Sequence, residues 1–67
     1  MNKIDATPVA RLLLSAEEAA EALRFSRARI YEEIAAGRLR SIKVGRIRRV
    51  PVKALEDYIA AREAEAS

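Results

Sequence analysis

Residues 15–37 read SAEEAAEALRFSRARIYEEIAAG, and they contain the most informative local pattern of the chain. Ser15 stands three residues before Glu18, which is the spacing of a capping box at a helix N-terminus. Small apolar residues then repeat at helical spacing. The pattern predicts a first short helix over residues 16–23.

The second half of the stretch carries its own start and stop signals. Ser26 is a good N-cap residue, Ile30 and Ile34 are four apart on one helical face, and Gly37 is a terminator. These signals predict a second helix over residues 27–36, after a break of only a few residues. Two short helices joined so tightly indicate a helix-turn-helix, in which small side chains on the first helix let the second pack across it. The small side chains expected at that crossing belong to Ala19 and Ala20.

Downstream of the helices, two short β-branched runs surround a glycine turn. Residues 42–44 and 47–50 flank Gly45-Arg46, which predicts a hairpin. Pro51 ends it, and a last helix is expected over residues 52–63. Its inner face is expected to carry Leu55, Tyr58, Ile59 and Arg62.

The remaining segments complete the predicted organisation of the 67-residue chain. Residues 1–11 have no apolar period and are expected to form a flexible N-terminal arm, while Leu12, Leu13 and Leu14 suit one short strand. Residues 64–67 are expected to fray. The prediction is one domain over residues 12–63, because a chain of this size cannot build a second core. Its fold class is mainly α with a small β-hairpin.

Composition excludes several classes of function. The chain has no Cys and no His, so disulfides, soft metal sites, thiol nucleophiles and imidazole bases are all absent. No apolar run is long enough for a membrane span. We therefore expect a protein that is not an enzyme, has no catalytic or metal-binding residues and no cofactor, and is cytoplasmic.

The charged residues are segregated along the chain. Residues 24–53 contain ten Lys and Arg against two acidic residues, a net charge of +8, whereas the rest of the chain has a net charge of −5. Eight of the ten are Arg, the side chain suited to bidentate contacts with phosphate and guanine. This distribution favours a polyanion as the partner, rather than a merely solvated charged surface.

The ordered set of short motifs resembles the excisionase-type, MerR-like winged helix-turn-helix family of bacteria, phages and plasmids. The resemblance covers about residues 13–59. The motifs that carry it are Leu14-Ser15-Ala16-Glu17-Glu18-Ala19-Ala20, Ser26-Arg27, Ile30-Tyr31, Gly37-Arg38-Leu39, Val44-Gly45-Arg46, Val50-Pro51 and Leu55-Glu56-Asp57-Tyr58.

The resemblance implies three helices plus a wing, with the second helix in the DNA major groove and the hairpin along the backbone or the adjacent minor groove. Three residues depart from the family pattern. Arg24 stands where Gly is frequent, which costs roughly 1 kcal/mol if the turn needs a left-handed residue there. Glu33 replaces a usually apolar residue, and Arg48 stands where an aromatic residue is common.

Helical geometry places the candidate major-groove residues. With Ile30 and Ile34 pointing inward, steps of about 100° turn Ala28, Arg29 and Glu32 outward. Arg27 and Arg29 suit guanine O6 and N7, Ala28 a thymine methyl group and Glu32 cytosine N4 or a neighbouring Arg. The expected major-groove set is therefore Arg27, Ala28, Arg29 and Glu32.

Other polar residues suit the DNA backbone. Ser26 caps the second helix and is also a candidate to donate a hydrogen bond to a phosphate. Tyr31 suits either the core or a phosphate contact through its hydroxyl group. The expected phosphate contacts are Ser26, Tyr31, Arg38, Lys43, Arg48 and Arg49. At the tip of the hairpin, Gly45 permits a positive φ and Arg46 is the candidate for the minor groove.

Three functions remain open from the sequence. The first is a recombination directionality factor that binds and bends attachment-site DNA and assists an integrase, with other copies of itself beside it on the DNA. The second is a small transcription regulator with the same binding mode. The third is a protein-interaction module, such as an antitoxin, that uses its acidic last helix. We expect double-stranded DNA as the partner, no membrane, a nucleoid-associated location and a monomer in the free state.

Overall fold

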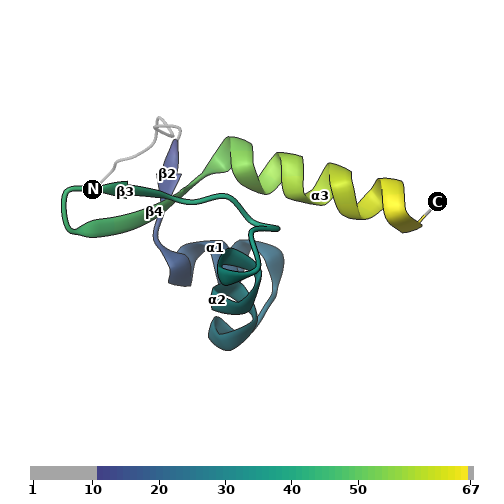
Figure 1. Cartoon of the computed structure of the whole chain (residues 1–67), viewed down its shortest axis with the longest axis horizontal. Helices are drawn as coiled ribbons and strands as arrows, with labels where there is room; N and C mark the ends of the chain where they lie inside the picture. The colour runs from purple at the N-terminus through teal and green to yellow at the C-terminus, as the bar shows by residue number, and fades with distance from the viewer. Residues whose placement is uncertain (1–10, 67) are drawn as a thin grey trace, which may run out of the picture.

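The computed structural model of the chain describes residues 11–66 as three helices and a three-stranded antiparallel sheet. In chain order the elements are β2 (Leu13–Leu14), α1 (Ala16–Leu23), α2 (Arg27–Ala35), β3 (Ile42–Val44), β4 (Ile47–Pro51) and α3 (Val52–Ala66). In Figure 1 the hairpin of β3 and β4 projects to one side, α3 extends to the other, and α1 and α2 lie together below them. The predicted fold class, a winged helix-turn-helix, is confirmed.

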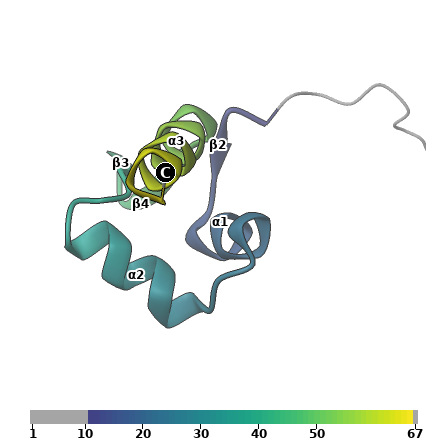
Figure 2. The same cartoon turned by 90° about the vertical axis from the view of Figure 1, so that its right-hand side faces the viewer.

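Both predicted N-caps are present. Each serine satisfies a backbone N–H group that the start of a helix leaves unpaired. The Ser15 hydroxyl accepts from the Glu18 N–H at 3.0 Å, and the Glu18 carboxylate accepts from the Ser15 N–H at 2.9 Å. The Ser26 hydroxyl accepts from the Arg29 N–H at 3.1 Å. Between the helices, Arg24 adopts the left-handed conformation, with φ 60° and ψ 37°. The chain therefore turns sharply within a few residues, and Figure 2 shows α2 lengthwise and α1 end-on.

The sheet joins the start of the domain to the hairpin. β4 lies in the centre, with β3 on one side and β2 on the other. The short strand was predicted, but its place was not: Leu14 pairs with Val50, across 36 positions of the sequence. At the hairpin tip, Gly45 has a φ of +64°, as predicted, and Arg46 follows at a negative φ. A positive φ at the first of two central residues is the pattern of a type II′ turn.

The core lies where the sheet meets the three helices. Its fully buried large side chains are Ile30, Leu39 and Val50. The predicted small residues of α1, Ala19 and Ala20, are also buried. On α3, Leu55 and Tyr58 are buried as predicted, but the prediction for Ile59 was wrong. That side chain is 44% exposed, because one further step of about 100° along the helix turns it away from the core.

The ends of the helices differ from the predictions by a few residues. α3 continues to Ala66, three residues beyond the predicted end, so the expected fraying of residues 64–66 is wrong. Ala, Glu and Arg are strong helix formers, and Arg62 and Glu65 form an ion pair at 2.8 Å on this last stretch. α2 ends at Ala35, one residue early, before Gly37 with a φ of +80°. The predicted arm lies outside the described residues except for its last residue, Arg11.

Candidate nucleic-acid interface

α2 buries one face and leaves the opposite face open. Ile30 is fully buried and Ile34 packs partly against the core. Two of the predicted major-groove residues, Ala28 and Glu32, lie on the exposed outer face, as the helical period requires. Ser26, at the N-terminus of α2, is also exposed. The structure therefore leaves the outer face of α2 available to a partner.

Arg27 and Tyr31 lie on one flank of this outer face. The Arg27 guanidinium group is 5.7 Å from the centre of the Tyr31 ring, and its Nη2 is 3.3 Å from Glu17 Oε2 on α1. The Arg27 side chain remains 70% exposed. Tyr31 is 44% exposed, so it is a surface residue of α2 rather than a core residue. The two side chains present a cation and a hydroxyl group on the same flank.

Arg29 lies on the other flank, which differs from the outward position expected from the sequence. Its Nε donates to Glu33 Oε2 at 3.3 Å, and its guanidinium group stacks on the Phe25 ring at 4.7 Å. Glu33 lies one turn along α2 and is buried, so it draws Arg29 toward the inner side of the helix. The Arg29 side chain is still 51% exposed.

Glu33 is a functional candidate that the sequence reasoning did not include. Its carboxylate accepts from Arg38 Nε at 2.9 Å, from Arg38 Nη2 at 2.8 Å and from the Tyr58 hydroxyl at 2.9 Å. Arg38, then Tyr58, are the main causes that lower the pKa of Glu33 from 4.5 to about 2. In return, the carboxylate raises the pKa of the Arg38 guanidinium group. The signal in the sequence that could have identified Glu33 is an acidic residue directly before Ile34, which faces inward.

The wing has one basic face and one aliphatic face. Lys43 lies opposite Arg48, and directly opposed residues of an antiparallel pair share a face. Arg48 Nη1 donates to the Ser41 hydroxyl at 2.8 Å, whereas Lys43 makes no ion pair within residues 11–66. The exposed side chains of the other face belong to Ile42, Val44 and Ile47. Their aliphatic character leaves most of the positive charge to the first face.

The two other basic residues of the hairpin lie outside that pair. Arg49 is half-buried on the aliphatic face, opposite Ile42, and its Nη1 donates to the Arg48 carbonyl at 3.0 Å. Arg46 is exposed at the tip, and its side chain bonds to none of the described residues. Of the hairpin residues predicted to contact phosphate, the structure therefore brings Lys43 and Arg48 together and places Arg49 apart from them.

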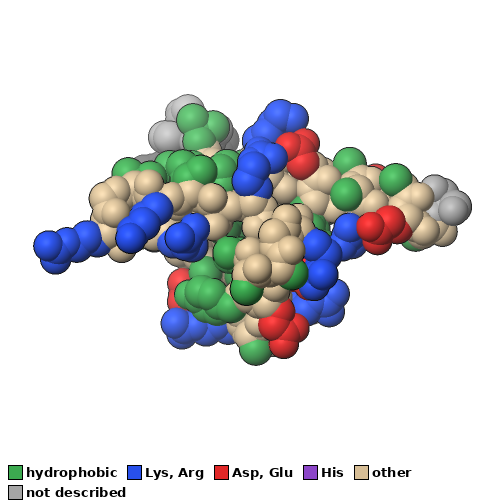
Figure 3. Space-filling model, viewed as in Figure 1, with side chains coloured by type: hydrophobic (Ala, Val, Ile, Leu, Met, Phe, Trp, Pro, Cys, Tyr) green, Lys and Arg blue, Asp and Glu red, His purple; other side chains and the backbone are tan. Residues whose placement is uncertain are grey.

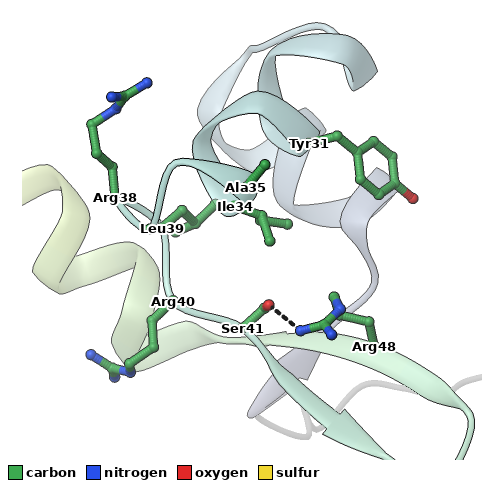
Figure 4. Close-up of a pocket in the computed structure, with 9 residues that line it drawn as sticks. Tyr31, Ile34, Ala35, Arg38, Leu39, Arg40, Ser41 and Arg48 are labelled. Carbon is green, nitrogen blue, oxygen red and sulfur yellow. Dashed lines mark hydrogen bonds between the residues drawn. The ribbon is translucent and has the colours of Figure 1, made fainter.

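An open groove of about 900 Å³ separates α2 from the wing. Tyr31 and Ile34 line it from α2, and Ser41 and Arg48 line it from the hairpin side, as Figure 4 shows. Arg38 extends away from Tyr31 and Arg48 in this view. The groove therefore joins the Tyr31 flank of α2 to the basic face of the wing.

Not all the basic residues predicted from the charge segregation are available to a partner. Arg40 and Lys53 both pair with Asp57 on α3, at 3.1 and 3.2 Å, and these contacts lower the pKa of the Asp57 carboxyl group. In Figure 3, Lys and Arg side chains extend along the hairpin and border the lower, helical part on both sides. The positive charge available to a polyanion is therefore concentrated around α2 and on the wing.

Residues 11–66 contain no group of three or more side chains that suits a metal ion. Within the same part of the chain, every helix is too short or too polar to cross a membrane.

Comparison with known proteins places this arrangement in a family. Residues 13–63 match a helix-turn-helix domain family. Over 50 residues, covering 75% of this chain, the sequence is 44% identical to a probable excisionase from Saccharopolyspora erythraea. The chain spans about half the length of this curated relative, 51% of it. No solved structure shows significant similarity. The matched residues include both helices of the turn, the wing and most of α3, and the chain belongs to the excisionase-type helix-turn-helix family of DNA-binding proteins.

Proposed function

We propose that this protein binds duplex DNA sequence-specifically as a recombination directionality factor, bending attachment-site DNA and assisting an integrase. The observation that carries the proposal is the pairing of an open outer face on α2 with a wing whose Lys43 and Arg46 have no acidic partner within residues 11–66. Likeness to a probable excisionase supports the recombination role.

In this proposal the two elements divide the contacts. α2 enters the major groove, where Ala28, Glu32 and the guanidinium groups of Arg27 and Arg29 meet base edges. The wing follows the backbone, and Arg46 reaches the minor groove from the tip that Gly45 forms. The proposed phosphate contacts are Ser26, Tyr31, Arg38, Lys43, Arg48 and Arg49.

A salt titration tests the DNA-binding part of the proposal. About five neutralised phosphates give a log–log slope of affinity against salt near −4 to −5. Fluorescence anisotropy on a labelled duplex measures this slope, and a slope near zero would overturn the proposal. The same titration on Lys43→Ala/Arg46→Ala should be shallower by about 2, because two cations that neutralise backbone charge, one at a phosphate and one in the minor groove, are lost.

A second pair of residues supplies a matched control. Arg40→Ala/Lys53→Ala removes the same two residue types, but both side chains are engaged with Asp57 on α3. This variant should keep the slope of the unmodified chain. Equal slopes for the two double variants would show that total charge, and not the wing, governs binding.

The recombination role needs an assay of its own. With the integrase of the same element, the protein should bend attachment-site DNA and promote excision. DNA binding that represses or activates a promoter without affecting excision would identify a transcription regulator instead. Binding to a protein partner without salt-dependent DNA binding would identify an interaction module.

A further inference from the structure

Glu33 is the one charged residue that is buried within residues 11–66, with 3% of its surface exposed. A buried carboxylate is costly unless its oxygens are fully hydrogen-bonded. Here Oε1 accepts from Arg38 Nε and from the Tyr58 hydroxyl, and Oε2 accepts from Arg38 Nη2 and Arg29 Nε. Four donors from three side chains therefore converge on one carboxylate.

Each of the two arginines donates to Glu33 with some of its guanidinium nitrogens and leaves the others unbonded within residues 11–66. Arg38 uses Nε and Nη2 on Glu33, which leaves Nη1, and Arg29 uses only Nε, which leaves Nη1 and Nη2. No described residue accepts from these three remaining nitrogens. Both side chains are half exposed, at 51% for Arg29 and 49% for Arg38. The Phe25 ring also supports the guanidinium plane of Arg29.

The free nitrogens of Arg29 lie on the side of α2 away from the wing, and the Arg38 side chain, which follows α2, extends away from Tyr31 and Arg48 in Figure 4. Tyr31 lines the groove next to the wing, and Arg29, two residues earlier, lies about 160° around the helix from it. The group of Glu33, Arg29 and Arg38 has a net charge of +1, so it keeps an attraction for anions. A duplex seated on α2 would therefore meet cations from the wing on one side and from this group on the other.

We infer that Glu33 is a positioning residue for DNA binding, which presets the guanidinium groups of Arg29 and Arg38 before DNA arrives. An unrestrained Arg side chain loses rotamer freedom when it binds, whereas a side chain already held in one geometry loses less. Bidentate contact with Glu33 fixes the plane of Arg38, and its remaining Nη1 then has a defined direction. The inference rests on the proposed DNA binding and adds a residue that does not itself touch DNA.

The direction in which one substitution changes DNA affinity distinguishes a positioning role of Glu33 from an effect of net charge. Glu33→Gln removes a negative charge, so an effect of net charge alone would strengthen DNA binding. Positioning predicts the opposite, because a neutral amide cannot hold two guanidinium groups. We expect affinity for duplex DNA to fall about tenfold and the salt slope to become shallower by about 1.

Two controls isolate the effect. Glu21→Gln removes an exposed carboxylate of α1 that has no side-chain partner within residues 11–66, and it should leave affinity equal or slightly higher. Tyr58→Phe removes a hydrogen bond to Glu33 but keeps both arginines in place, so it should lower thermal stability without changing the salt slope. If Tyr58→Phe made the salt slope as shallow as Glu33→Gln does, the inference would be overturned, because the effect would then be one of stability.

A second variant covers the case in which Glu33→Gln does not fold. Arg38→Lys keeps the charge and an ionic partner for Glu33, but a lysine cannot make the two-point contact. Its affinity should fall about fivefold at constant net charge, with the helical circular dichroism signal retained. Unchanged affinity in folded Arg38→Lys, or equal or tighter binding in folded Glu33→Gln, would overturn the inference. Absence of DNA binding by the unmodified chain would instead overturn the proposed function.

Discussion

Glu33 should make the stability of the protein depend on acid pH. Its pKa is about 2 in the folded chain, against an ordinary value of 4.5, chiefly because Arg38 and Tyr58 donate to the carboxylate. A lowered folded-state pKa stabilises the fold above pH 4.5, and this stabilisation is lost as the pH falls from about 4.5 toward 2. We therefore expect the melting temperature to decrease over that range.

Thermal melts followed by circular dichroism between pH 2 and 7 would measure this dependence. Glu33→Gln should have a lower melting temperature at neutral pH and a flatter pH profile. Some dependence should remain in that variant, because the pKa values of Glu18 and Asp57 are also lowered. Parallel profiles for Glu33→Gln and the unmodified chain would contradict the assignment to Glu33.

The backbone conformation of Arg24 should lower the stability of the fold by a measurable amount. It is the one non-glycine residue with a positive φ within residues 11–66, at the break between α1 and α2. For an L-residue this conformation costs about 1–2 kcal/mol, and the greater freedom of an unfolded glycine offsets part of the gain from replacing it. Arg24→Gly should therefore raise the free energy of unfolding by about 0.5–1 kcal/mol. Urea denaturation would measure it, with Arg24→Ala as the control that removes the side chain but keeps the strain.

At the scale of elements, the wing is the part whose geometry depends on one glycine. Gly45 has a φ of +64°, and a side chain added there would meet nothing within 4 Å. The cost of replacing it is therefore conformational rather than a steric clash. Gly45→Val should distort the turn and, with Arg46→Ala, should abolish specific binding and bending while the helix content stays intact.

Asparagine supplies the matched variant, because it adopts a positive φ more readily than most other non-glycine residues. Gly45→Asn should retain most of the affinity, whereas Gly45→Val should lose it even with Arg46 present. Mobility of circularly permuted DNA fragments would report the bend, and circular dichroism would report the helices. Unchanged bending by Gly45→Val/Arg46→Ala would refute the role of the wing.

The elements also show which features a sequence can reveal. The caps at Ser15 and Ser26 and the turn at Gly45 were predicted, because each depends on contacts within a few residues. The hydrogen bond from Tyr58 to Glu33 spans 25 positions, and it depends on how α3 packs against α2. No local pattern contains that information.

The same difference explains the candidate site. The outward positions of Ala28 and Glu32 follow from the helical period alone, and the structure agrees. Arg29 was expected beside them, but a buried acid one turn away and an aromatic ring draw its side chain to the flank. The helical period predicts where each Cα atom lies around the helix axis. The partners of a long side chain depend instead on the tertiary structure.

At the scale of the whole molecule, charge is divided between the two ends of the fold. The basic hairpin projects at one end of the molecule, and α3, with its acidic residues, extends at the other. The Arg40 and Lys53 pairs with Asp57 neutralise positive charge where α3 begins. A polyanion is therefore attracted to α2 and the wing and repelled by the far part of α3, which orients the protein before contact.

The size of the molecule leads to a prediction about cooperation on DNA. Its longest extent is 42 Å, so one copy can cover only about 12 base pairs of duplex at roughly 3.4 Å each. Contacts over so few base pairs give limited discrimination against a genome, and several copies side by side or a bend are needed. We expect a monomer in solution, because the exposed large aliphatic side chains within residues 11–66 are few, whereas a stable interface needs about 800 Å² per partner. On DNA with two adjacent sites, the second copy should bind more tightly than the first.

Light scattering would report the oligomeric state of the free protein, and gel-shift titrations would compare one site, two sites, and two sites separated by five additional base pairs. That insertion turns the second copy to the opposite face of the duplex, so it should abolish the cooperation, and equal cooperation with and without the insertion would show that neighbouring copies do not act through direct contact.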